Sequence, residues 1–208
     1  MGTKIDYIVS LGNKCWCSVA MRQAGVRRFS GPLDWLVSRQ FRSVLELFDC
    51  DFEDFLTGYV PITFTMSPNG RRYRMLDTKY DVELRHELRL IDESKKDALD
   101  MSLNERRGHY IRRCKRIKEF MSTPCNILFM RETADEWHED SKIILDSLQS
   151  RCTAKVFLLH ATYDDPPKNL PEEVLHVQLD KSRTHQEQIR DIQTALSAYE
   201  FSYMNGEQ

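Results

Sequence analysis

The sequence predicts an α/β protein with a central, largely parallel or mixed sheet flanked by helices. The evidence lies mainly in the second half of the chain, where three short apolar runs occupy 126–130, 154–159 and 174–179. These runs are continuous rather than alternating, as in strands buried on both faces. Helical patterns over 135–149 and 185–199 follow the first and the third run. Such alternation of strand and helix is typical of a parallel sheet.

The N-terminal segment predicts a strand, a tight turn and a helix. An apolar run at 7–9 is followed by the turn 10–15 and by a helix over 16–25, with Gly25 as its C-cap. Cys15 therefore lies near the start of a helix. Unpaired backbone N–H groups and the helix dipole stabilise a thiolate there, so Cys15 is a candidate nucleophile. The alternative is a buried structural thiol, with Gly12 serving only the turn.

A second helix is predicted over 35–48, after the helix-breaking Ser30-Gly31-Pro32. Asp34 is placed to cap it, and Trp35 would be a core aromatic residue. The apolar residues at helical spacing are Leu36, Val37, Phe41, Val44, Leu45 and Phe48.

The chain is long enough for one domain, 1–208, in which 49–80 could form a small inserted lobe. Asn69-Gly70 predicts a turn between short strands. In the following strand, alternation places Tyr80, Val82, Leu84 and His86 on one face. His86 is then either a core-edge histidine or a general base at a strand end.

Residues 104–121 predict a basic amphipathic helix. Its arginines and lysines could bind phosphates or acidic partners, although such a face is more often simply solvated. The basic residues are Arg106, Arg107, Arg112, Arg113, Lys115, Arg116 and Lys118.

Composition narrows the class of protein. The formal net charge is -2, which provides no general attraction to nucleic acid or to anionic membranes. There is no transmembrane-length apolar run and no secretory signal pattern. Six cysteines without such a signal favour reduced thiols and a cytoplasmic location.

The motifs of common cofactor and metal sites are missing from the sequence. There is neither a Walker loop nor a dinucleotide glycine fingerprint, and Cys15-x-Cys17 has no second pair at zinc spacing. We therefore expect no metal and no cofactor. His160, at the end of a strand and followed by Asp164 and Asp165, is an alternative base to His86.

Several blocks carry a resemblance to a known family. The segments Ser10-Leu11-Gly12-x-x-Cys15 and Ser30-Gly31-Pro32-Leu33-Asp34-Trp35 resemble the signature of the family called "Putative papain-like cysteine peptidase". The run 80–87, with His86, resembles its histidine motif, and 128–131 resembles its strand ending in arginine. The resemblance implies Cys15 as nucleophile, His86 as base, and Asp34 as third member or structural acid. It also implies a papain-like α+β fold as an alternative, in which the sheet carrying the histidine is antiparallel.

Together these observations predict a thiol-dependent hydrolase or acyl transferase acting on a peptide, amide or ester. Asn13 and backbone N–H groups of the turn would stabilise the oxyanion, while Trp35 and Arg131 would contact the substrate. Two alternatives stay open. One is a nucleotide-sugar or phosphate-using transferase on a Rossmann-like sheet, with Arg131 at a strand end. The other is a non-enzymatic binding module that uses the basic helix.

Overall fold

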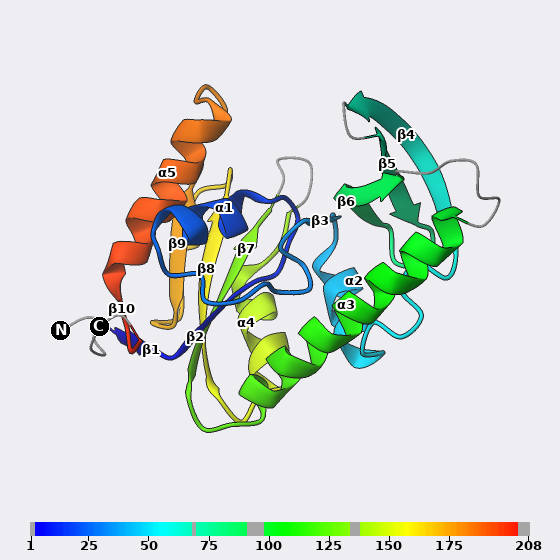
Figure 1. Ribbon diagram of the computed structural model, residues 1–208. Coiled ribbons are helices and arrows are strands. Elements are labelled where there is room, and N and C mark those ends of the chain that lie inside the picture. Colours follow the sequence, from blue (N-terminus) through cyan, green and yellow to red (C-terminus); the bar gives the residue numbers. More distant parts are fainter. Residues whose placement is uncertain (1–2, 68–69, 91–97, 134–137, 204–208) are drawn as a thin grey trace.

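The computed structural model describes residues 3–67, 70–90, 98–133 and 138–203, except for the side chains of 64–67, 70–72, 86–90 and 98–100. It contains two four-stranded sheets side by side, one parallel and one antiparallel, with helices packed around them (Figure 1). The prediction of an α/β protein with parallel or mixed sheets is confirmed. The papain-like α+β alternative expects an antiparallel sheet, and the second sheet of the structure is antiparallel.

The parallel sheet has the strand order β2-β7-β8-β9. These strands are β2 (Tyr7–Ser10), β7 (Asn126–Glu132), β8 (Lys155–Thr162) and β9 (Val174–Gln178). Six consecutive residues of β7 and seven of β8 are buried, as their continuous apolar runs predict. All four strands point the same way, so the carboxyl ends of β2, β7 and β8 meet at one edge.

Helices cover both faces of this sheet. Successive side chains of a strand point to opposite faces, and in β7 and β8 the side chains on both faces are buried. Leu128 and Leu159 pack into a cluster with α1 (Trp16–Gln23) and α5 (His185–Ala195). Phe129 and Leu158 face a second cluster, which includes residues of α4 (Ser141–Gln149) and α3 (Ala98–Met121). Figure 1 shows α1 and α5 on one side of the strands and α4 on the other.

The antiparallel sheet has the strand order β3-β6-β5-β4. Its strands are β3 (Leu36–Ser38), β4 (Tyr59–Ser67), β5 (Gly70–Asp77) and β6 (Val82–Leu90), and α2 (Phe41–Asp49) follows β3. Met75 and Val82 belong to the same buried cluster as Val9 and Phe129 of the parallel sheet. One core therefore joins the two sheets, and β5 pairs with β6, a strand from outside 49–80, while β4 pairs with β5. The long α3 lies across this core, from the antiparallel sheet towards α4 (Figure 1).

The first and last described strands form a separate parallel pair, β1 (Thr3–Ile5) with β10 (Tyr199–Phe201). Strand β10 follows α5 and a short 3-10 turn, Leu196–Ala198. It ties the end of α5 to the segment that leads into β2.

Three local predictions are wrong. The helix expected over 35–48 begins only at Phe41, because Leu36 and Ser38 pair with β6, so Asp34 does not cap it. The helix expected over 135–149 begins at Ser141 with Asp140 as its cap, and residues 134–137 lie outside the described part. The apolar spacing in that helix also predicts that Ile143 faces inward, but its side chain is 64% exposed.

Candidate active site

The turn before α1 has an unusual backbone that only certain residues adopt. Gly12 has φ +78° and Asn13 has φ 74°, both in the left-handed region that glycine and asparagine tolerate best. A Cβ added to Gly12 would lie 2.8 Å from Ser38 Oγ. The turn therefore also requires a residue without a side chain at this position. These two residues redirect the chain from β2 and place Cys15 directly before the first residue of α1.

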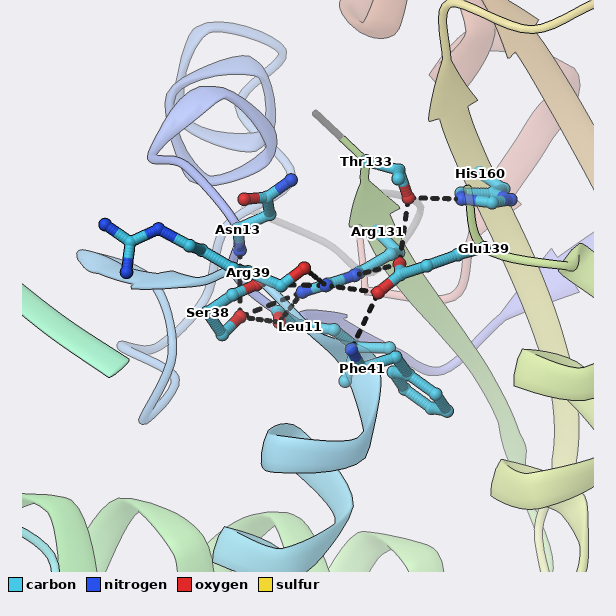
Figure 2. Close-up of polar contacts among 9 residues, drawn as sticks. All are labelled: Leu11, Asn13, Ser38, Arg39, Phe41, Arg131, Thr133, Glu139 and His160. Atoms are coloured by element: carbon cyan, nitrogen blue, oxygen red, sulfur yellow. Dashed lines mark hydrogen bonds and ion pairs between the residues drawn. The ribbon is translucent and has the colours of Figure 1, made fainter. Parts of the chain in front are cut away.

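A buried hydroxyl holds this turn in place. Ser38 Oγ donates to the carbonyl oxygen of Leu11 at 3.2 Å and accepts from the backbone N–H of Asn13 at 3.0 Å. It also accepts from Nη1 of Arg131 at 2.8 Å, and the same nitrogen donates to Leu11 O at 3.1 Å (Figure 2). Strand β3 and the end of β7 therefore fix the segment that leads to Cys15.

A buried ion pair with Glu139 holds the Arg131 side chain in position. Arg131 Nε and Nη2 donate to the two carboxylate oxygens of Glu139, each at 2.8 Å (Figure 2). Burial raises the pKa of Glu139, but the hydrogen bonds and charge of Arg131 outweigh it and leave the pKa below its usual value. Arg131 is fully buried and bonded to Ser38, Leu11 and Glu139, so it holds the turn before Cys15, and its expected substrate contact stays a prediction.

His160 extends the same network and is not placed as a base for Cys15. Ser141 Oγ and Thr133 Oγ1 each lie 2.7 Å from one of its ring nitrogens. Thr133 Oγ1 donates to Glu139 at 2.9 Å, so the network assigns the ring proton to Nε2 of His160. Burial lowers the pKa of His160 to about 4, and the ring is neutral at physiological pH.

Cys15 opens into a cavity of about 250 Å³ formed by four parts of the chain. The start of α1, the 35–37 segment, β6 and the start of α5 contribute its walls. The lining residues are Lys14, Cys15, Trp16, Trp35, Val37, Arg85 and His185. A thiol, an imidazole, two cationic side chains and two indole rings thus face one space.

The pKa of the Cys15 thiol is raised in the folded protein. Burial raises its pKa above the usual value of 9.0, and the nearby carboxylate of Glu132 raises it further. A backbone hydrogen bond at Cys15, together with the charges of Arg85 and Lys14, lowers the pKa without reversing the shift. The helix start therefore does not by itself produce a thiolate, and a base is needed to remove the proton during attack.

His185 is the described histidine that shares this cavity with Cys15, and no local pattern in the sequence singles it out. It is the first residue of α5, directly after Thr184, whose side chain and Glu187 form a capping box. Its ring lies 4.9 Å from that of Trp16, centroid to centroid. No residue spacing links positions 15 and 185, since only the packing of α5 against α1 brings them together.

The other predicted site residues have different outcomes. Trp35 lines the cavity, as expected for a substrate contact. The Asp34 carboxylate is buried, bonded to the Arg27 guanidinium and to the N–H of Gly31 at 2.9 Å. His86 is in β6, but its side chain lies outside the described part, so its role and any contact with Asp34 stay predictions.

Two polar side chains beside the site lack hydrogen-bond partners within the described ranges. Asn13 Nδ2 is buried without an acceptor, and Asn13 does not line the cavity. The carboxylate of Glu132 is fully buried; Lys14 Nζ lies 3.2 Å from Oε1, and the charge of Arg131 also favours the ionised form. Burial raises the pKa of Glu132. Lys14 in turn lies over the Trp16 ring, 4.2 Å from its centroid, which fixes one wall of the cavity.

Other cavities are less suited to the predicted chemistry. One cavity, of about 420 Å³, lies between α2 and α4 and contains no thiol. Another, about 290 Å³, lies at the carboxyl edge of the parallel sheet and is lined by Asp140, Asp164 and Asp165. These carboxylates would repel phosphate, so this edge does not favour the nucleotide-sugar hypothesis.

Comparison with known proteins gives one match. The family model described as "Putative papain-like cysteine peptidase" matches residues 6–161, well over half of the chain. The chain belongs to this family. The matched segment includes Cys15, Asp34 and His86, whereas His185 lies beyond it. No protein with a curated description and no solved structure matches the chain.

Proposed function

We propose that the protein is a thiol-dependent hydrolase or acyl transferase in which Cys15 is the nucleophile and His185 is the base. The observation that carries this proposal is that Cys15 and His185 line the same cavity. Membership in a family described as cysteine peptidases supports the use of a thiol. The choice of His185 as base rests on its place in the cavity lining, and the side chain of His86 lies outside the described residues.

The first half of the reaction forms a thioester. The His185 imidazole takes the proton from Cys15 Sγ while the sulfur attacks the substrate carbonyl carbon. Backbone N–H groups in the first turn of α1, which have no intrahelical acceptor, are suited to stabilise the oxyanion. The intermediate then expels the amine or alcohol, which takes the proton back from His185. In the second half, His185 takes a proton from water as the hydroxide adds to the thioester carbonyl carbon. The tetrahedral intermediate then expels the Cys15 thiolate, which takes the proton back from His185, and the carboxylic acid leaves the cavity.

The cavity walls indicate how a substrate would be held. Trp16 and Trp35 offer aromatic surface for an apolar group. Arg85 is bound to buried Glu83 at 3.1 and 3.2 Å, and Lys14 is bound to Glu132, so both cations are held in place. A peptide, amide or ester of modest size fits a cavity of about 250 Å³ better than a folded protein.

The test is to trap the acyl intermediate. The native protein is incubated with p-nitrophenyl acetate, and the acetylated cysteine is located by peptide mass mapping. We expect the acetyl group on Cys15 and its loss in Cys15→Ala. Cys125→Ala is the matched control, because Cys125 is also a half-buried free thiol but does not line the cavity. Acetylation spread equally over the four half-buried thiols, or unchanged in Cys15→Ala, would contradict the proposal.

Two further features bear on where the protein acts. No helix within the described ranges is long and apolar enough to cross a membrane. All six cysteines are free thiols. Free thiols persist in reducing compartments, which supports the proposal of a cytoplasmic location.

A further inference from the structure

A second cavity, of about 320 Å³, lies on the exposed side of α3. Ser30 from the loop after α1 lines one part of it, and four α3 residues line the rest. These are His109, Arg112, Arg113 and Arg116. Their spacing of three and four places all four side chains on one face of the helix. The cavity shares no lining residue with that of Cys15.

The cavity gathers positive charge with little to balance it. Neither Arg112 nor Arg116 has a carboxylate partner in the described part of the chain, and as an i,i+4 pair of like charges they repel each other. The nearest acid to His109 is Glu105, 3.9 Å from Nε2, and its side chain is 75% exposed. A protein with net charge -2 thus concentrates three guanidinium groups in one concavity.

Neighbouring contacts hold the polar groups in position. The Arg116 guanidinium lies 5.8 Å from the centroid of the Phe29 ring, and that of Arg113 lies 5.9 Å from the ring of Tyr110. Ser30 Oγ accepts a hydrogen bond from Arg27 Nη2 at 3.0 Å. The hydroxyl proton of Ser30 is thereby left to donate to another group. Side chains held in this way lose less conformational entropy when a ligand binds.

We propose that this cavity binds a phosphate monoester. Planar guanidinium groups donate paired hydrogen bonds, which match the tetrahedral array of oxygens on phosphate. Ser30 and His109 add donors on either side of the arginines. The cavity volume is at the lower end of the range for small-molecule sites, so the ligand is a small phosphorylated group rather than a long polyanion.

Calorimetric titration with inorganic phosphate, against sodium chloride of equal ionic strength, tests the site. The wild type should bind one phosphate per chain, and Arg112→Gln/Arg116→Gln should lower the affinity about tenfold or more. The matched control is Lys115→Gln/Lys168→Gln, which removes two exposed positive charges outside the cavity. It should bind like the wild type. Circular dichroism establishes that each variant is folded.

Two results would overturn the proposal. One is no saturable phosphate binding by the wild type, and the other is an equal loss in both double variants, which would indicate general charge attraction. A second arm compares glycerol phosphate with a phosphoserine peptide and its unphosphorylated form. Tighter binding of the phosphopeptide identifies a modified protein as the source of the phosphate, whereas equal binding of glycerol phosphate identifies a small metabolite.

Discussion

The ring of His185 packs against the indole of Trp16, with centroids 4.9 Å apart and planes inclined by 49°. Trp16 is the residue after Cys15, so this contact fixes an imidazole at the cavity into which the thiol opens. The contact depends on α1 and α5 packing on the same face of the parallel sheet. The candidate catalytic pair is therefore a product of tertiary structure, and its supports can be tested one at a time.

The turn that carries Cys15 should depend strongly on Gly12. Gly12→Ala forces a left-handed φ on alanine and places its Cβ 2.8 Å from Ser38 Oγ, which disrupts a hub of three hydrogen bonds. Gly25→Ala is the matched control, because Gly25 has φ +72° but nothing within 4 Å of the added atom. We expect a loss of about 1 kcal/mol for Gly25→Ala and about 3 kcal/mol for Gly12→Ala in urea unfolding. Equal losses would show that the close approach to Ser38 is unimportant.

Removal of the arginine from its buried pair should be costly. Arg131→Met leaves the Glu139 carboxylate without its bidentate partner, and we expect a loss of about 3–5 kcal/mol in unfolding free energy. Arg42→Met serves as the control, because Arg42 forms an exposed i,i+4 pair with Glu46 that should contribute less than about 0.5 kcal/mol. If Arg131→Met costs as little as Arg42→Met, Arg131 does not hold the fold and its assigned positioning role is wrong.

His160 should make stability depend on pH in a defined window. Its pKa falls from 6.5 to about 4 in the folded state because burial disfavours the charged ring. A depressed pKa means that the unfolded chain binds the proton more tightly, so the contribution is complete above about pH 6.5 and is lost as the pH falls towards 4. The full effect is up to about 3 kcal/mol. In denaturant unfolding, the stability difference between wild type and His160→Gln should shrink between pH 7 and pH 4.5, and a constant difference would contradict the assignment.

The thiols should differ in reactivity according to burial. Cys15 opens into a cavity, whereas Cys17 and Cys114 are fully buried, and burial raises the pKa of Cys114 to about 12. Under native conditions iodoacetamide should label Cys15 well before these two, as measured by mass mapping over time. Because the pKa of Cys15 is itself raised, its labelling rate should continue to increase above pH 9. A rate that levels off below pH 7 would reveal a preformed thiolate.

The sequence was informative wherever local patterns determine structure. Continuous apolar runs located β7, β8 and β9, and the turn signals around Gly12 located the start of α1. The prediction of a helix over 35–48 was wrong at its first residues for a physical reason. Its apolar spacing fits a helix, but Leu36 and Ser38 form better contacts by pairing with β6. Tertiary pairing overrode local preference there.

The candidate site was only partly predictable for a similar reason. Cys15 and Trp35 could be selected from local context and from the resemblance to the family. His185 could not, because its proximity to Cys15 depends on how helices from opposite ends of the chain pack. Arg131 could be selected as an arginine at a strand end, but its buried partners could not be predicted, because Ser38 lies in β3, 93 residues away, and Glu139 lies in the segment before α4.

The central proposal is that His185 is the base that takes the proton from the Cys15 thiol. The most direct measurement is the rate of thioester formation with p-nitrophenyl acetate at pH 7, followed by p-nitrophenolate release in the wild type, His185→Asn and His86→Asn. The account predicts a drop of about 100-fold or more for His185→Asn, since the protonated thiol then lacks its base, and little change for His86→Asn. A wild-type rate in His185→Asn, together with a large loss in His86→Asn, would contradict it and assign the base to β6.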